Sequence, residues 1–124
     1  MKLYESSEDY LETILILLQE NGSVRAIDVA KKMGFTKASV SVALHKLEDN
    51  GYIAIKKTGD IILTEEGYTI ASKIYERHLV LSEILMCIGV SEEQAKIDAC
   101  KIEHDLAEET FACIKNKLKE LKGE

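Results

Sequence analysis

Hydrophobic residues recur three and four positions apart through most of the chain, which is the spacing of one buried face of an α-helix. Polar residues suited to N-caps, Ser7, Thr36 and Ser91, stand before three of these stretches, and Gly34 and Gly89 end two of them. The pattern therefore predicts a mostly helical protein. We expect helices over residues 7–20, 26–33, 37–49, 65–88, 92–105 and 107–121.

The segment between the third and fourth helices has a different pattern. Two short runs rich in β-branched residues, 52–56 and 60–63, flank Lys57-Thr58-Gly59, which is typical of a β-hairpin. Two helices joined by a short glycine-containing turn and followed by a hairpin describe a winged helix-turn-helix. We therefore expect a mainly α fold with a small β-hairpin wing, divided into a winged helix-turn-helix module over 1–73 and a helical module over 74–124.

In such a fold the third helix enters the major groove of DNA, and the wing lies beside it along the backbone. Hydroxyl groups on this helix can bind phosphates or base edges, whereas Arg25 and the lysines of the wing would contact the DNA backbone. The structural alternative is a solvated helix face, and some winged helices bind proteins instead of DNA. The candidate DNA-binding residues are Arg25, Thr36, Lys37, Ser39, Ser41, His45, Lys56 and Lys57, with Val42 and Lys46 on the same face.

Charge and composition narrow the classes of function. The net charge of −6 conceals an asymmetry, because residues 23–73 carry eight Lys and Arg against six Asp and Glu. Local fields, not the total charge, decide DNA binding. No apolar stretch is long enough to span a membrane and the acidic N-terminus lacks the core of a signal peptide, so we expect a cytoplasmic protein. Three cysteines without a CxxC pair favour free thiols or a metal ligand, and we expect Cys87 and Cys113 to be buried thiols.

The most informative spacing lies in the predicted fifth helix, where Cys100, Glu103 and His104 occupy positions i, i+3 and i+4. At this spacing a thiolate, a carboxylate and an imidazole share one helical face, which provides half or more of a transition-metal site. The first helix adds a pair of carboxylates at i and i+3, and the fourth adds a histidine. The candidate metal ligands are therefore Asp9, Glu12, His78, Cys100, Glu103 and His104.

Each of these residues also has a purely structural explanation. A lone cysteine is more often a buried small hydrophobe, a lone histidine is more often a surface or satisfied core residue, and acidic residues in a first turn suit the helix dipole. Cysteine, histidine and carboxylates also occur in metal hydrolases, which keep an open metal position and a substrate cleft. The sequence has no Gly-rich phosphate loop and no nucleophile elbow, so we expect neither an enzyme nor a small-molecule substrate.

Five stretches carry a family resemblance that runs in order along nearly the whole chain. They are SSEDYLETI, VAKKMGFTKASVSVALHKLEDNGYI, ILTEEGYTIA, YERHLVLSEIL followed by GV, and DACKIEHDL. Through them the chain resembles the diphtheria toxin repressor and manganese transport regulator family of metal-dependent bacterial repressors. The resemblance implies a homodimer that binds a palindromic operator, a divalent metal as co-repressor, and target genes concerned with metal uptake. It also implies that residues 74–124 form a metal-binding and dimerisation module.

The resemblance also assigns ligand positions. The candidate ligands stand where the manganese branch has its ligands, except that Cys100 stands where the manganese branch has glutamate and the iron branch has cysteine. The iron branch has methionine at the position of Asp9, and its second site uses a histidine and a glutamate where this chain has Lys96 and Ser82. The ligand set is thus a mixture of the two branches. Because the sequence ends at Glu124, we also expect no SH3-like third domain.

The donor atoms favour certain metals over others. A thiolate favours softer ions such as Fe²⁺, Co²⁺ or Zn²⁺, and carboxylates suit Mn²⁺. We expect Fe²⁺ first and Mn²⁺ next, with Zn²⁺ or Co²⁺ binding in vitro. The alternative function is a winged-helix regulator that does not respond to metal, and operator affinity with and without a chelator separates the two.

Overall fold

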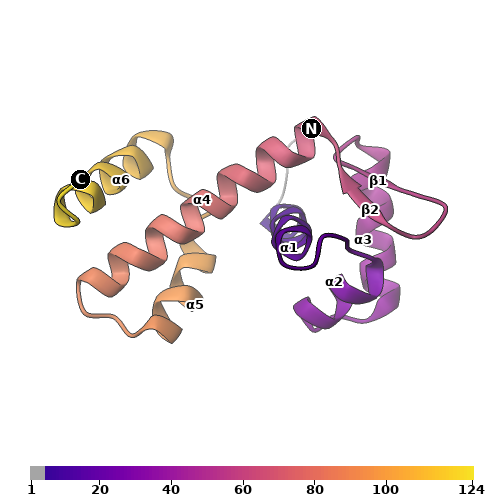
Figure 1. The fold of residues 1–124 in the computed structure, drawn as a ribbon, viewed down its shortest axis with the longest axis horizontal. Coiled ribbons are helices and arrows are strands. Elements are labelled where there is room, and N and C mark those ends of the chain that lie inside the picture. Colours follow the sequence, from indigo (N-terminus) through magenta and orange to yellow (C-terminus); the bar gives the residue numbers. More distant parts are fainter. Residues whose placement is uncertain (1–4) are drawn as a thin grey trace. The chain divides into compact units, whose positions relative to one another are not determined.

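The structure, a computed structural model, describes residues 5–124 and divides into two compact units, with the division between Ser72 and Lys73 inside one long helix (Figure 1). The first unit holds three helices, a two-stranded sheet and the start of the long helix; the second holds the rest of that helix and two more helices. The elements are α1 (Glu5–Asn21), α2 (Ala26–Met33), α3 (Lys37–Asp49), β1 (Ile53–Ile55), β2 (Ile61–Leu63), α4 (Glu65–Cys87), α5 (Glu92–Ile102) and α6 (Glu108–Leu121).

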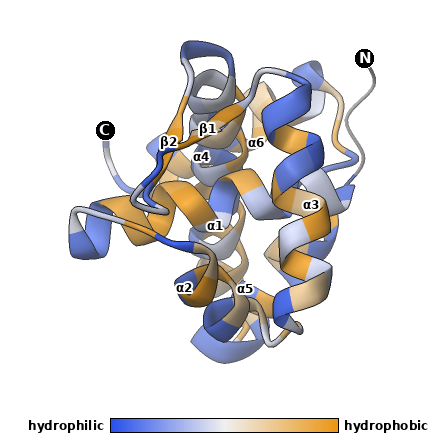
Figure 2. Cartoon of the chain, turned by 90° about the vertical axis from the view of Figure 1, so that its right-hand side faces the viewer, coloured by the Kyte–Doolittle hydropathy of each residue, from blue (hydrophilic) through white to orange (hydrophobic). Residues whose placement is uncertain are grey.

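The helix-turn-helix of the first unit is set by local signals between α2 and α3. Gly34 takes a left-handed conformation, with φ 72°, and its amide donates to the carbonyl of Ala30, which ends α2. Thr36 then caps α3 by accepting a hydrogen bond from the Ser39 amide at 3.2 Å. Both helices have the predicted bounds, because their sequences contain the signals that start and stop them. Along α3 in Figure 2 the ribbon passes repeatedly between hydrophobic and hydrophilic residues, as expected for a helix with one buried face.

The wing is an antiparallel pair of short strands, β1 and β2, that follows α3. Ile53 pairs with Leu63 and Ile55 with Ile61, so the sheet is three residues long on each strand. The amide of Ile61 also donates to the carbonyl of Val24 at 2.9 Å, which ties the hairpin to the segment before α2. The predicted fold class, mainly α with a β-hairpin wing, is confirmed.

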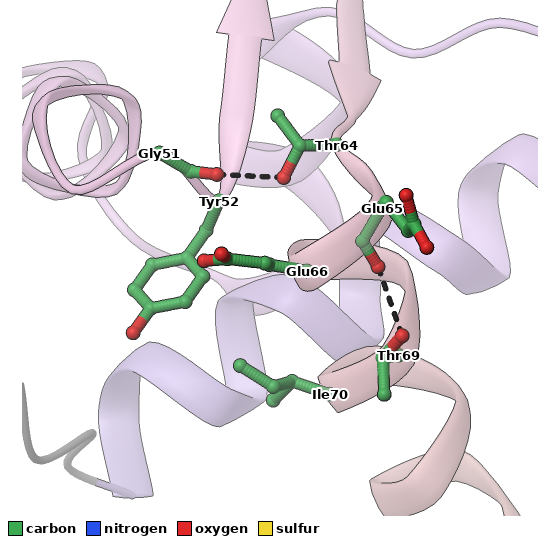
Figure 3. Close-up of a pocket in the computed structure, with 7 residues that line it drawn as sticks. All are labelled: Gly51, Tyr52, Thr64, Glu65, Glu66, Thr69 and Ile70. Atoms are coloured by element: carbon green, nitrogen blue, oxygen red, sulfur yellow. Dashed lines mark hydrogen bonds between the residues drawn. The ribbon is translucent and has the colours of Figure 1, made fainter.

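The base of the wing is braced against the start of α4 (Figure 3). The hydroxyl of Thr64 donates to the carbonyl of Gly51 at 2.6 Å, and the amide of Thr64 donates to the carbonyl of Tyr52 at 3.1 Å. The same hydroxyl accepts from the amide of Gly67 at 3.2 Å, which caps the first turn of α4. One threonine therefore fixes both the end of the wing and the beginning of the long helix.

The second unit is built around the C-terminal part of α4, with α5 and α6 flanking it in Figure 1. Its buried side chains include Leu81 of α4, Ala99 of α5, and Phe111 and Leu118 of α6. Ion pairs also join α6 to α4, including Lys115 with Glu76 at 2.9 Å and Lys122 with Glu83 at 3.0 Å. None of the helices in the described part of the chain is long and apolar enough to cross a membrane.

Two expectations about the second unit were wrong. Helix α5 ends at Ile102, not at residue 105, and residues 103–105 form a turn. Cys87 and Cys113 are exposed rather than buried, because Cys87 is the last residue of α4 and Cys113 lies off the face of α6 that buries Phe111. Apolar character alone did not reveal which face of each helix packs inward.

Candidate metal centre and nucleic-acid interface

Three predicted ligands converge within the second unit. His78 projects from the middle of α4, Cys100 from the last turn of α5, and Glu103 from the residue that follows α5. The Nδ1 atom of His78 lies 3.1 Å from Oε2 of Glu103 and 3.6 Å from Sγ of Cys100. One ligand atom from each of the three lies within 4.8 Å of the others.

The spacing of these atoms fits a metal ion. Ligands at about 2.0–2.3 Å from a tetrahedral ion stand about 3.3–3.8 Å from one another. The observed separation of 3.6 Å lies within that range, and that of 3.1 Å lies slightly below it. A nitrogen, a sulfur and an oxygen donor together suit a first-row transition metal such as Fe²⁺, Co²⁺ or Zn²⁺. The three side chains can therefore hold a divalent cation with only small adjustments.

The electrostatics of the cluster also favour a cation. The hydrogen bond to Cys100, and to a smaller extent the hydrogen bond to Glu103, raises the pKa of His78 to about 10, although burial of the ring opposes the shift. In the metal-free protein the imidazole thus holds a proton between a sulfur and a carboxylate. A metal ion that binds through His78 must displace this proton, which makes metal binding and proton release linked events.

Glu103 is the most buried member of the cluster, with an exposed fraction of 0%. Its Oε1 atom has no hydrogen-bond partner among the described residues, although Nε2 of His104 lies 3.5 Å away. A buried carboxylate is costly unless its lone pairs are matched by donors or by a cation. A metal ion bound beside Oε1 would remove this cost.

The three remaining predicted ligands are His104, Asp9 and Glu12. His104 lies in the turn after α5, so the argument that it shares a helical face with Cys100 was wrong, yet its side chain is 2% exposed and its ring adjoins Glu103. Asp9 and Glu12 lie one turn apart on α1, in the first unit. The structure thus brings together His78, Cys100 and Glu103, with His104 beside them.

The predicted DNA-binding side chains lie on the exposed surface of the first unit. Val40, Leu44 and Leu47 form the buried face of α3, which leaves the opposite face free. Val42 on that face is 60% exposed. The other exposed candidates are Arg25, Thr36, Lys37, Ser39, Ser41, His45, Lys46, Lys56 and Lys57.

Several of these groups are already engaged in local contacts. The Thr36 hydroxyl caps α3, and Nδ1 of His45 bonds to the carbonyl of Ser41 at 2.8 Å. The guanidinium of Arg25 donates through Nη2 to the carbonyl of Thr58 at the tip of the wing. Arg25 thus holds the wing tip, a structural contact that the sequence did not predict.

Sequence reasoning also missed Arg77, which precedes His78 on α4. Its guanidinium is buried and donates to carbonyls in the turn after α5. The residue types around it give no local signal of this contact, because its partners lie 26 and 29 positions further along the chain.

Two family models match nearly the whole chain. The model for the iron dependent repressor N-terminal DNA binding domain matches residues 2–61, and the model for the iron dependent repressor metal binding and dimerisation domain matches residues 64–123. The resemblance identified in the sequence is therefore confirmed.

Curated relatives agree with the family models. The HTH-type transcriptional regulator MntR of Geobacillus kaustophilus is 37% identical over 102 residues, which cover 82% of this chain and 72% of that protein. The transcriptional regulator MntR of Escherichia coli is 36% identical over 107 residues, which cover 86% of this chain and 69% of that protein.

Solved structures share the fold. The structure of IdeR from T. acidophilum superposes with a TM-score of 0.76 at 25% identity over 100% of this chain and 56% of that one. A manganese-dependent transcriptional repressor in complex with manganese superposes with a TM-score of 0.82 at 26% identity over 90% of this chain and 52% of that one. The chain thus spans about half the length of these two proteins. The family models, the relatives and the shared fold together show that the chain belongs to the iron-dependent repressor family of metal-dependent, DNA-binding transcriptional repressors.

Proposed function

We propose that this chain represses transcription as a homodimer on a palindromic operator, with a divalent metal held at His78, Cys100 and Glu103 as its co-repressor. The observation that carries the proposal is the convergence of the Cys100 sulfur and the Glu103 carboxylate on the Nδ1 atom of His78, in a chain whose other unit is a winged helix. His104, beside Glu103, is proposed as a further ligand. We assign DNA binding to residues 1–73 and metal binding and dimerisation to residues 74–124, in the order of the two family models, which match residues 2–61 and 64–123.

Asp9 and Glu12 are proposed as additional ligands on the basis of the sequence motif. Without metal, the carboxylates among the proposed ligands repel one another, which would leave the DNA-reading unit free to move. A divalent cation neutralises that charge and removes the repulsion. Coupling between an effector and a ligand is commonly worth about 1–3 kcal/mol, which corresponds to an increase of roughly 5- to 150-fold in operator affinity.

The identity of the metal depends on the donor at position 100. The relative of known structure named as manganese-dependent supports Mn²⁺. The sulfur of Cys100, 3.6 Å from the imidazole nitrogen, supports a softer ion. We propose that this sulfur biases the centre toward Fe²⁺, with Mn²⁺ as the second activator.

Exposed apolar side chains of the second unit are the proposed dimer surface. Contiguous apolar surface left in water commonly marks an interface. Phe111 does not belong to this surface, because it is buried within the unit. The exposed large hydrophobic residues of the second unit are Leu79, Met86, Ile88, Ile97, Ile102 and Leu121.

On DNA, the exposed face of α3 is proposed to enter the major groove, with Lys56 and Lys57 of the wing on the backbone. A dimer that binds successive major grooves holds its recognition helices about 34 Å apart. The operator should therefore contain two inverted half-sites one helical turn apart.

The test is a Co²⁺ titration of the full chain, followed by ultraviolet and visible absorption and by isothermal titration calorimetry. The native protein should show a thiolate-to-cobalt absorption band, which Cys100→Ser should remove while weaker binding persists through the remaining ligands. Glu93→Gln, which changes an exposed acid at the start of α5, is the matched control and should leave the band unchanged. A native protein without the band, or a Cys100→Ser variant that retains it, would show that Cys100 is not a ligand.

A further inference from the structure

The side chain of Arg77 connects α4 to the turn between α5 and α6. Its Nη1 atom donates to the carbonyl of Glu103 at 3.0 Å and to the carbonyl of Leu106 at 2.8 Å. Its Nη2 atom donates to Oε1 of Glu108 at 3.3 Å, and its Cζ atom lies 5.3 Å from the centre of the Phe111 ring. The residue is 5% exposed, so these contacts hold the guanidinium in one place.

These contacts explain why α5 ends where it does. Residues 103–107 contain neither glycine nor proline, and the sequence alone predicted a helix through residue 105. The carbonyl groups at the end of a helix have no partners within the helix, and a cation placed there is stabilised by them. Arg77 supplies both the donors and the charge, so a residue from another helix fixes the turn that follows Ile102.

The same turn carries two of the proposed metal ligands. Glu103 is the residue whose backbone carbonyl Arg77 holds, and His104 follows it directly. Arg77 also adjoins His78 on α4, so a single turn of α4 sets the position of one ligand and anchors the backbone of another. The carboxylate of Glu103 meets His78 at 3.1 Å only if the turn keeps this conformation.

We propose that Arg77 is a positioning residue of the metal centre: by holding the carbonyls of Glu103 and Leu106, it keeps the Glu103 carboxylate opposite His78 and Cys100 before metal arrives. This inference rests on the proposed function of that cluster. It goes beyond it by assigning a role to a residue that carries no metal-binding group.

Packing alone does not account for an arginine at this position. Burial of a guanidinium is costly. The Nε atom of Arg77 has no hydrogen-bond partner within the described part of the chain. The side chain of Glu108, which pairs with the guanidinium, is 71% exposed. An apolar side chain of similar length would fill the space above Phe111 without this cost. The feature that only arginine provides is a planar group whose Nη1 atom donates to both carbonyl oxygens while its Nη2 atom donates to Glu108.

The inference is tested with Arg77→Met and Arg77→Lys in the full chain. Methionine keeps the length and the apolar stem but donates no hydrogen bond, whereas lysine keeps the charge but loses the planar fork. Lys115→Met is the matched control, because it removes another cation that joins α6 to α4, at Glu76, without touching the turn after α5. Each variant is titrated with Co²⁺, and its metal-free thermal unfolding is recorded by circular dichroism.

Loss of a group that orients metal ligands typically weakens metal binding about 10- to 100-fold. We expect a loss of that size in Arg77→Met, a smaller loss in Arg77→Lys, and an altered cobalt spectrum in both. Hydrogen exchange of the amides at residues 103–107 should also become faster in metal-free Arg77→Lys, which reports on the turn even if Arg77→Met fails to fold. Lys115→Met should show native cobalt affinity and native exchange in that turn.

The inference would be overturned if Arg77→Lys kept the native cobalt affinity and spectrum and if its amide hydrogen exchange at residues 103–107 were unchanged. Arg77 would then have a role in stability alone. His78→Ala separates this failure from failure of the proposed function. If His78→Ala binds Co²⁺ as tightly as the native chain, the cluster is not the metal site and both proposals fall. If His78→Ala loses binding while both Arg77 variants retain it, only the role of Arg77 is lost.

Discussion

Replacement of Gly67 by alanine tests how the wing is joined to α4. The first turn of α4 passes so close to Tyr52 that a Cβ atom at position 67 would overlap the Tyr52 carbonyl oxygen and lie 2.9 Å from its carbonyl carbon. Side-chain Cβ atoms essentially never approach another heavy atom closer than 3.0 Å. Because both partners are backbone, relief requires movement of the wing base or of α4, not a change of rotamer.

The size of the effect follows from these contacts. Overpacking of a well-packed site costs about 1–3 kcal/mol. The displaced Tyr52 carbonyl also accepts the hydrogen bond from the Thr64 amide at 3.1 Å, whose loss costs about 0.5–1.5 kcal/mol. We therefore expect Gly67→Ala to lower the free energy of unfolding by about 2–4 kcal/mol. Because β1 begins directly after Tyr52, operator affinity should fall as well.

The assay is thermal and urea unfolding of the metal-free chain, followed by circular dichroism. Gly89→Ala is the control, because Gly89 has a φ of 103° but nothing within 4 Å of its added Cβ, so that variant should report backbone strain alone, about 1–2 kcal/mol. If Gly67→Ala is as stable as the native chain, or no less stable than Gly89→Ala, the close approach of α4 to the wing base is refuted.

Three further substitutions address the metal centre and the DNA surface. His78→Ala removes the atom on which the cluster converges and should abolish tight Co²⁺ binding in calorimetry; native affinity would exclude this histidine as a ligand. Lys37→Ala removes one exposed cation at the start of α3, so the slope of log K against log salt concentration should fall by about 0.9, and an unchanged slope would remove Lys37 from the phosphate contacts. Arg25→Ala should speed hydrogen exchange of the amides at 57–59, since its contact with Thr58 holds the wing tip; native exchange rates would show that the wing does not need this contact.

Where the sequence contains its own start and stop signals, the structure follows it closely. The bounds of α2 and α3 were predicted because Gly34 and Thr36 act through their nearest neighbours. The strands of the wing are one residue shorter than predicted at both ends of β1 and at the start of β2. The outer residues of a short hairpin pair incompletely, which explains the difference. Local chemistry was therefore sufficient for the DNA-reading unit.

The second unit depends more on contacts between distant residues. The end of α5 was misplaced because Arg77, 26 residues before Glu103, sets it. His78, Cys100 and Glu103 were each plausible ligands from sequence, but only the packing of α5 against α4 brings their atoms together. A sequence pattern shows which residues share a helical face, whereas the pairing of those faces is decided by the whole core.

In the proposed function, a divalent metal switches on operator binding. Its most direct test is fluorescence anisotropy of a labelled operator with the full chain under anaerobic conditions, first with a chelator and then with Fe²⁺, Mn²⁺ or Zn²⁺. The operator is obtained beforehand by in vitro selection, performed both with metal and with chelator. We expect weak binding without metal and an increase of roughly 5- to 150-fold, or more where two ions act together, when Fe²⁺ or Mn²⁺ is added. Equal affinity of the metal-free and metal-loaded protein for the same operator would contradict it.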